Sequence, residues 1–94
     1  MSTPALEIDT TGLRCPLPVL ALARRILEIK VGEIIAMTSD DPASGPDVHA
    51  WARMTGHTFI SEDPLSIGKR FLVRRESTED PTKGLPEGGF PEGF

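Results

Sequence analysis

Segments with helical spacing of apolar residues alternate with short apolar runs between residues 5 and 75, and this alternation restricts the fold more than any other feature. Residues 16–30 and 44–56 each carry apolar side chains at the spacing of one helical face. The short runs 5–9, 33–39, 57–62 and 69–75 are predicted to be strands. Run 33–39 contains a continuous apolar stretch, and run 69–75 alternates so that Phe71 and Val73 share one face. The two helical faces consist of Val19, Leu20, Ala23, Ile26 and Leu27, and of Val48, Trp51, Ala52 and Thr55.

The resulting order of elements, β-α-β-α-β-β, predicts a two-layer α/β sandwich. Strands joined by a helix are expected to be parallel neighbours or near neighbours with right-handed crossovers. The last two strands, separated by the loop 63–68, should pair as an antiparallel hairpin. Both helices would then cover one face of a four-stranded mixed sheet.

Proline and glycine mark the expected ends of the two helices. Proline is favoured in the first turn, so Pro16 or Pro18 begins the first helix, and residues 31–32 end it. The second helix is expected to have its cap at residues 44–45 and to end at Gly56.

Charge divides the chain into a neutral domain and an acidic tail. Residues 1–75 contain nine basic and nine acidic residues, whereas residues 76–94 contain five acids and one lysine, which is the whole net charge of −4. The tail also has four Gly and three Pro and no apolar periodicity. We therefore predict one folded domain over residues 1–75 and a disordered tail over residues 76–94. In an alternative interpretation, Phe90 and Phe94 make the tail a partner-binding segment.

Composition argues against several classes of protein. No apolar run approaches the ~20 residues of a membrane span, and the first residues do not resemble a signal peptide, so we expect a cytoplasmic protein without a membrane partner. A neutral domain with few aromatic residues is poorly suited to direct nucleic-acid binding. One cysteine excludes an internal disulfide and a cysteine-rich zinc site. His49 and His57 lack neighbouring metal ligands in the sequence, so we expect no metal site. We also expect no cofactor and a monomeric protein.

The single cysteine, Cys15, is the strongest candidate for chemistry. It precedes Pro16 and Pro18 at the expected start of the first helix, where the prolines would mount an exposed sulfur rigidly. The helix N-terminus and the neighbouring Arg14 both favour a thiolate, so we expect the pKa of Cys15 to lie below the ordinary value of about 8.5. The alternative is that Cys15 is a small buried apolar residue, as free cysteines often are.

Two further pairs of charged residues have both structural and functional interpretations. Asp40 and Asp41 could be an acid–base pair, but adjacent positions at a strand end point to opposite faces, so turn formation before Pro42 is the favoured account. Arg24 and Arg25, together with Arg14, could form a basic rim that docks an acidic partner. They could equally be an ordinary solvated helix face.

Several motifs in this order resemble the TusA/SirA/YedF family of small sulfur carriers. The resemblance covers about residues 6–75 and leaves the tail outside. It rests on Gly12-Leu13-Arg14-Cys15-Pro16-Leu17-Pro18, Asp40-Asp41-Pro42-Ala43-Ser44, Asp47, Trp51 and Gly56-His57.

The resemblance implies the β-α-β-α-β-β sandwich and a persulfide carried on Cys15, without independent enzymatic turnover. It implies a cysteine desulfurase or rhodanese as sulfur donor. The acceptor would be a DsrE-like or other sulfur-relay protein, in tRNA thiolation, molybdenum-cofactor assembly or sulfur oxidation. Two alternatives remain: a redox sensor in which Cys15 is oxidised, and a regulatory interaction module in which Cys15 has no chemical role.

Overall fold

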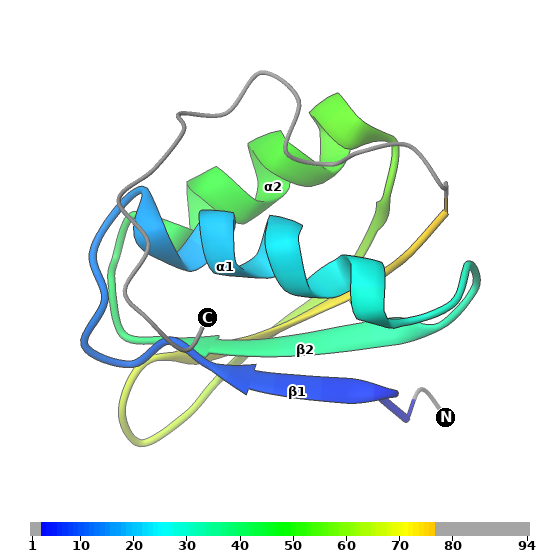
Figure 1. Ribbon diagram of the computed structural model, residues 1–94. Coiled ribbons are helices and arrows are strands. Elements are labelled where there is room, and N and C mark those ends of the chain that lie inside the picture. Colours follow the sequence, from blue (N-terminus) through cyan, green and yellow to red (C-terminus); the bar gives the residue numbers. More distant parts are fainter. Residues whose placement is uncertain (1–2, 77–94) are drawn as a thin grey trace.

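A computed structural model of the chain describes residues 3–76. Helices and strands alternate along the chain as expected from the sequence (Figure 1). The elements are β1 (Leu6–Asp9), α1 (Leu17–Arg25), the 3₁₀ helix η1 (Ile26–Glu28), β2 (Ile34–Ser39), α2 (Ser44–Thr55), β3 (Thr58–Pro64) and β4 (Lys69–Arg74).

The four strands form one mixed sheet in the order β1-β2-β4-β3. β1 and β2, which α1 connects, pair in parallel. β4 lies between β2 and β3 and pairs antiparallel with both, so β2 and β3 are parallel near neighbours. The predicted parallel pairing and the predicted hairpin are both confirmed.

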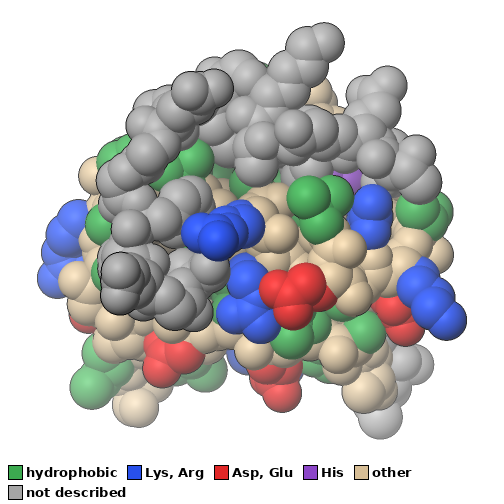
Figure 2. All heavy atoms as spheres, in the orientation of Figure 1, with side chains coloured by type: hydrophobic (Ala, Val, Ile, Leu, Met, Phe, Trp, Pro, Cys, Tyr) green, Lys and Arg blue, Asp and Glu red, His purple; other side chains and the backbone are tan. Residues whose placement is uncertain are grey.

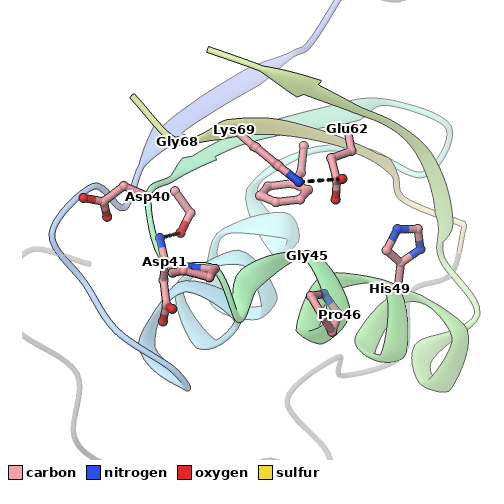
Figure 3. A pocket seen from close by; sticks show the side chains of 11 residues that line it. Asp40, Asp41, Gly45, Pro46, His49, Glu62, Gly68 and Lys69 are labelled. Atoms are coloured by element: carbon pink, nitrogen blue, oxygen red, sulfur yellow. Dashed lines mark hydrogen bonds and ion pairs between the residues drawn. The ribbon is translucent and has the colours of Figure 1, made fainter. Parts of the chain in front are cut away.

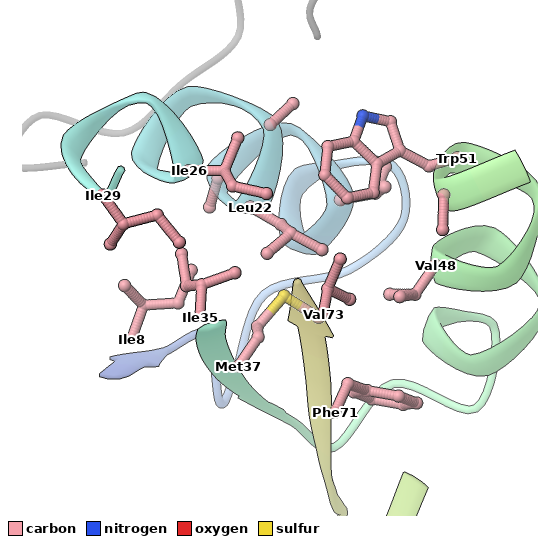
Figure 4. Packing of buried hydrophobic residues seen from close by; sticks show 14 residues of the cluster. Ile8, Leu22, Ile26, Ile29, Ile35, Met37, Val48, Trp51, Phe71 and Val73 are labelled. Atoms are coloured by element: carbon pink, nitrogen blue, oxygen red, sulfur yellow. The ribbon is translucent and has the colours of Figure 1, made fainter. Parts of the chain in front are cut away.

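Both helices cover the same face of the sheet, which confirms the two-layer sandwich (Figure 1). The core fills the space between the layers (Figure 4). Complete burial of a Val, Leu, Ile, Phe or Met side chain contributes about 1.5–3 kcal/mol. The buried cluster comprises Ile8, Val19, Ala21, Leu22, Ala23, Ile26, Ile29, Ile35, Met37, Val48, Trp51, Ala52, Phe71 and Val73.

The first helix is shorter than the sequence predicts. The α-helix ends at Arg25, and residues 26–28 form a 3₁₀ turn. In a 3₁₀ turn side chains three positions apart lie above one another, which is consistent with the burial of both Ile26 and Ile29 in the core. Leu27, expected on the apolar face, is instead 45% exposed.

Charges of both signs are interspersed over the face shown in Figure 2. Across the open face of the sheet, Arg70 on β4 reaches over β2 to Glu7 on β1, with 2.7 Å between Nη2 and Oε1. Ala36, the register partner of Glu7 on β2, is only 2% exposed although it faces away from the helices.

The described part of the chain, residues 3–76, contains no helix long and apolar enough to cross a membrane. The predicted tail lies outside the described residues except for Glu76. The Glu76 backbone N–H donates to His57 Nδ1 at 3.0 Å, and its carboxylate accepts from Arg74 at 2.9 Å. Glu76 is therefore bonded to the domain.

Candidate functional site

Cys15 lies in the loop between β1 and α1, at the edge of the sheet where the parallel strands β1 and β2 both end. Its side chain is exposed, as the sequence predicts, so it is not a buried apolar residue. Pro16 occupies the N-cap position of α1, and Pro18 is buried in the first turn. The Cys15–Pro16 peptide bond is cis.

Two adjacent aspartates at the end of β2 hold the cysteine loop in place. Asp41 Oδ2 accepts the Cys15 backbone N–H at 2.6 Å. Asp40 Oδ1 accepts the Gly12 backbone N–H at 2.9 Å and an Arg14 guanidinium N–H at 3.0 Å. Both carboxylates therefore bond to the cysteine loop across a sequence separation of more than twenty residues.

The predicted role of these aspartates in the turn is confirmed, but it is only part of what they do. Asp41 Oδ1 accepts the Ala43 N–H at 3.0 Å, and Asp41 O accepts the Ser44 N–H at 3.0 Å, which builds the turn into α2. The same side chains also support the cysteine loop, a role that was not predicted from the sequence. The spacing of the motif alone does not show that the β2 end and the cysteine loop are adjacent, although parallel pairing of the first two strands would have suggested it.

A buried hydrogen bond fixes the strand end that carries the aspartates. Ser39 Oγ and Ser44 Oγ are 2.6 Å apart, and both serines are 2% exposed. The Asp41 N–H also donates to Ser39 Oγ at 3.2 Å. On the other side of the cysteine loop, the buried Thr10 donates its hydroxyl to Thr38 O at 2.7 Å. These bonds tie the loop and the aspartates to the same rigid end of β2.

A hollow of about 250 Å³ opens beside the sulfur between α1 and α2. It has mostly apolar walls, including Trp51 and the 58% exposed Met54. Asp47, in the first turn of α2, contributes the carboxylate among the lining residues. The lining residues are Cys15, Pro16, Val19, Asp47, Ala50, Trp51 and Met54.

The expected lowering of the cysteine pKa is wrong: the surroundings raise the pKa of Cys15 above its ordinary value. The largest cause is a hydrogen bond to the Asp47 carboxylate, followed by desolvation of the thiolate by neighbouring atoms and by the negative charges of Asp47 and Asp41. Each favours the neutral thiol over the thiolate. The neighbouring Arg14 does not compensate, because its guanidinium is bonded to Asp40 Oδ1 and Leu13 O.

Arg24 and Arg25 lie in the last turn of α1, at the far end from Cys15. At a rise of 1.5 Å per residue, the nine residues of α1 separate them from the sulfur by roughly 13 Å along the axis. Neither arginine lines the hollow, and Arg25 forms an ion pair with Glu28. A role for Arg24 and Arg25 in docking a partner, together with Arg14, stays a prediction.

A second hollow, of about 510 Å³, is lined by the Asp40–Asp41 turn together with residues of α2, β3 and β4 (Figure 3). Lys69 and Glu62 form an ion pair in it, with 3.1 Å between Nζ and Oε2. His49 also lines it and stacks on Phe59, with 3.8 Å between the ring centroids. Among residues 3–76 no group of three or more His, Cys, Asp or Glu side chains could hold a metal ion.

Comparison with known proteins gives two findings. A family model described as "Sulfurtransferase TusA" matches residues 6–75, which is the described domain almost from end to end. The chain is also 28% identical over 89 residues to a Bacillus subtilis (strain 168) protein described as "Putative sulfur carrier protein YrkF". That alignment covers 93% of this chain and 48% of the relative, so the chain spans about half the length of this curated relative.

Proposed function

The chain belongs to the TusA sulfurtransferase family, and from this premise we propose that Cys15 accepts a persulfide sulfur from a donor enzyme and passes it to an acceptor protein. The observation that carries the proposal is the exposed Cys15 on a loop that Asp41 anchors, at the mouth of the hollow between the helices. A carrier cysteine must enter the site of another protein, and an exposed sulfur on a fixed backbone suits that task.

Loading is a thiol–disulfide type exchange. The Cys15 thiolate attacks the outer sulfur of the donor's persulfide, and a new S–S bond joins that sulfur to Sγ. The S–S bond of the donor breaks, and the donor cysteine leaves as a thiolate, which takes up the proton that the Cys15 thiol gave up. The transferred sulfur keeps its own hydrogen, so the step needs no oxidant or reductant.

Unloading repeats the exchange with Cys15 as the leaving group. A thiolate of the acceptor attacks the outer sulfur, the bond to Sγ breaks, and Cys15 returns to the thiolate. The sequence has no second cysteine. A neighbouring thiol would attack the inner sulfur and expel the cargo, so a lone cysteine favours retention of the sulfur until the acceptor binds.

The proposed donor is a cysteine desulfurase or a rhodanese, and the proposed acceptor is a DsrE-like or other sulfur-relay protein. tRNA thiolation, molybdenum-cofactor assembly and sulfur oxidation are the candidate destinations. The name of the Bacillus relative supports the carrier role and does not select among them.

The test is incubation of the full chain with a cysteine desulfurase and cysteine, followed by intact mass analysis before and after reduction. We expect a gain of one sulfur atom that a thiol reductant removes, and no gain in Cys15→Ser. A wild-type chain that gains no sulfur under these conditions contradicts the proposal. If it instead gains oxygen under peroxide, the redox-sensor alternative is favoured; if it gains neither, the interaction module is favoured.

A further inference from the structure

We propose that Asp47 holds the proton on Cys15 while the carrier is free, and that a cationic group of the exchange partner releases the thiolate by pairing with this carboxylate. The inference rests on the proposed function and names what the partner must bring to the site. Asp47 acts here as a positioning residue, because its carboxylate controls the protonation of the reacting sulfur without itself taking the transferred atom.

Asp47 lies in the first turn of α2 and lines the same hollow as Cys15. The other lining residues, Pro16, Val19, Ala50, Trp51 and Met54, have no charged side chain. Within residues 3–76, the lining that a partner group meets on its way to the sulfur therefore carries one charge, which is negative.

The charged groups near the sulfur come from several elements of the fold. Asp47 approaches Cys15 from α2, and Asp41 approaches from the turn between β2 and α2. α1, which begins next to Cys15, lines the hollow with Val19 and contributes no charge there. Arg14 is the neighbouring cation in the cysteine loop, and it is paired with Asp40. The potential at the sulfur is therefore negative, which agrees with the raised pKa of Cys15.

The two acidic residues near the sulfur are not equivalent. Asp41 uses one carboxylate oxygen for the Cys15 N–H and the other for the Ala43 N–H, so it supports the loop and the turn. Asp47 faces the hollow into which a partner would insert. Asp47 is therefore the carboxylate that a partner's cation can pair with while the loop stays anchored.

Negative charge near the sulfur affects both the loading and the unloading of Cys15. A thiol attacks only as its thiolate, and a thiolate leaves more readily when its pKa is low. A negative potential at Sγ slows both the attack by Cys15 on a donor and the departure of Cys15 toward an acceptor. A cation placed on Asp47 relieves both effects, so sulfur moves mainly inside a docked complex and the free thiol is shielded from stray oxidants.

The test uses small thiol reagents, so it does not depend on sulfur transfer. Asp47→Asn removes the charge and keeps the shape. Asp63→Asn, which alters an exposed aspartate of β3 in the same way, is the matched control. Each variant and the wild type are alkylated with neutral iodoacetamide across pH. They are then treated with a cationic and an anionic methanethiosulfonate of similar size.

We expect Asp47→Asn to move the alkylation midpoint to lower pH and to raise the rate at neutral pH about threefold or more, since one pKa unit corresponds to tenfold in the thiolate population. In the wild type the cationic reagent should react faster than the anionic one, and this ratio should fall several-fold in Asp47→Asn. Asp63→Asn should match the wild type in both measurements. An unchanged midpoint and an unchanged ratio in Asp47→Asn would overturn the inference.

Two further measurements remove the remaining ambiguities. If Asp47→Asn does not fold, the measurement on the wild type alone tests the proposal. The wild type must react faster with the cationic reagent than with the anionic one, and this preference must shrink as salt is added; absence of the preference refutes the proposal.

The cationic group proposed for the partner is tested by desulfurase-dependent loading. The loading rate should fall with added salt more steeply in the wild type than in Asp47→Asn. Equal salt dependence of the loading rate in the two proteins would refute the proposed role of a cationic group on the partner. Loss of loading with intact charge selectivity would instead refute the proposed function alone.

Discussion

Substitution of Gly68 by alanine should destabilise the domain far more than the same substitution at Gly56. Both glycines have a positive φ, +76° at Gly68 and +79° at Gly56, where an L residue costs about 1–2 kcal/mol. Their surroundings differ. A Cβ at Gly56 meets no atom within 4 Å, whereas a Cβ at Gly68 would lie 2.9 Å from Asp40 Cα and would overlap the Ser39 carbonyl oxygen.

The expected loss of stability follows from the conformational cost of the positive φ and from the contact with Ser39 and Asp40. Alanine reduces the entropy of the unfolded chain, which offsets about 0.4–1 kcal/mol of the conformational cost, so Gly56→Ala should lose about 1 kcal/mol. At Gly68 the backbone of Ser39 and Asp40 must also move, because Cβ atoms essentially never approach closer than 3.0 Å. Overpacking of this kind adds about 1–3 kcal/mol, so we expect a loss of about 2–4 kcal/mol for Gly68→Ala.

Thermal unfolding followed by circular dichroism measures the difference. For a domain of this size 1 kcal/mol corresponds to about 4–8 °C, so the two melting temperatures should differ by at least about 4 °C. Gly68→Ala should also slow desulfurase-dependent loading in the remaining folded protein, because the displaced backbone carries Asp40 and Asp41. Equal melting temperatures for the two variants would refute the argument from the Ser39–Asp40 contact.

Three other predictions concern the core, a buried histidine and the tail. Trp51→Ala should lower the free energy of unfolding by about 3–5 kcal/mol in urea titrations, because Trp51 is 2% exposed and belongs to the buried cluster. Burial, and next to it the charge of Arg75, lowers the pKa of His57, so its neutral form is favoured in the folded state. The stability that neutral His57 contributes is complete above its unfolded pKa of about 6.5 and declines as the pH falls from there toward the folded pKa. The melting temperature of His57→Gln should therefore depend less on pH over that range than the melting temperature of the wild type. A chain that ends at Glu76 should keep its melting temperature and its sulfur loading if residues 77–94 lie outside the domain, and calorimetry with the loading assay checks both.

The order of elements and the identity of the core were predictable because both are local properties of the sequence. The spacing of apolar residues identifies which side of a helix is buried, and Trp51 was placed in the core on that basis alone. Gly56 was correctly placed at the end of α2, since a glycine with positive φ is a common helix terminator. The exposure of Cys15 also followed from its neighbours, because prolines at a helix start keep the preceding residue in the loop.

The end of the first helix was less predictable. The spacing of Ile26 and Leu27 is compatible with a continuing α-helix, which would place both on the buried face. The change to a 3₁₀ turn after Arg25 buries Ile29 and exposes Leu27 instead. The packing of the last turn against the sheet selects between the two arrangements, and this choice leaves no periodic signal in three residues.

The direction in which the pKa of Cys15 shifts was decided by the tertiary structure alone. The sequence determined that a lone, exposed cysteine stands at a helix start beside Arg14, and those local features favour a thiolate. Asp41 and Asp47 lie 26 and 32 positions further along the chain, and only the packing of β1 beside β2 and of α1 beside α2 brings them to the sulfur. A pKa depends on distances through space, so the sign of its shift follows from the fold rather than from the neighbours in sequence.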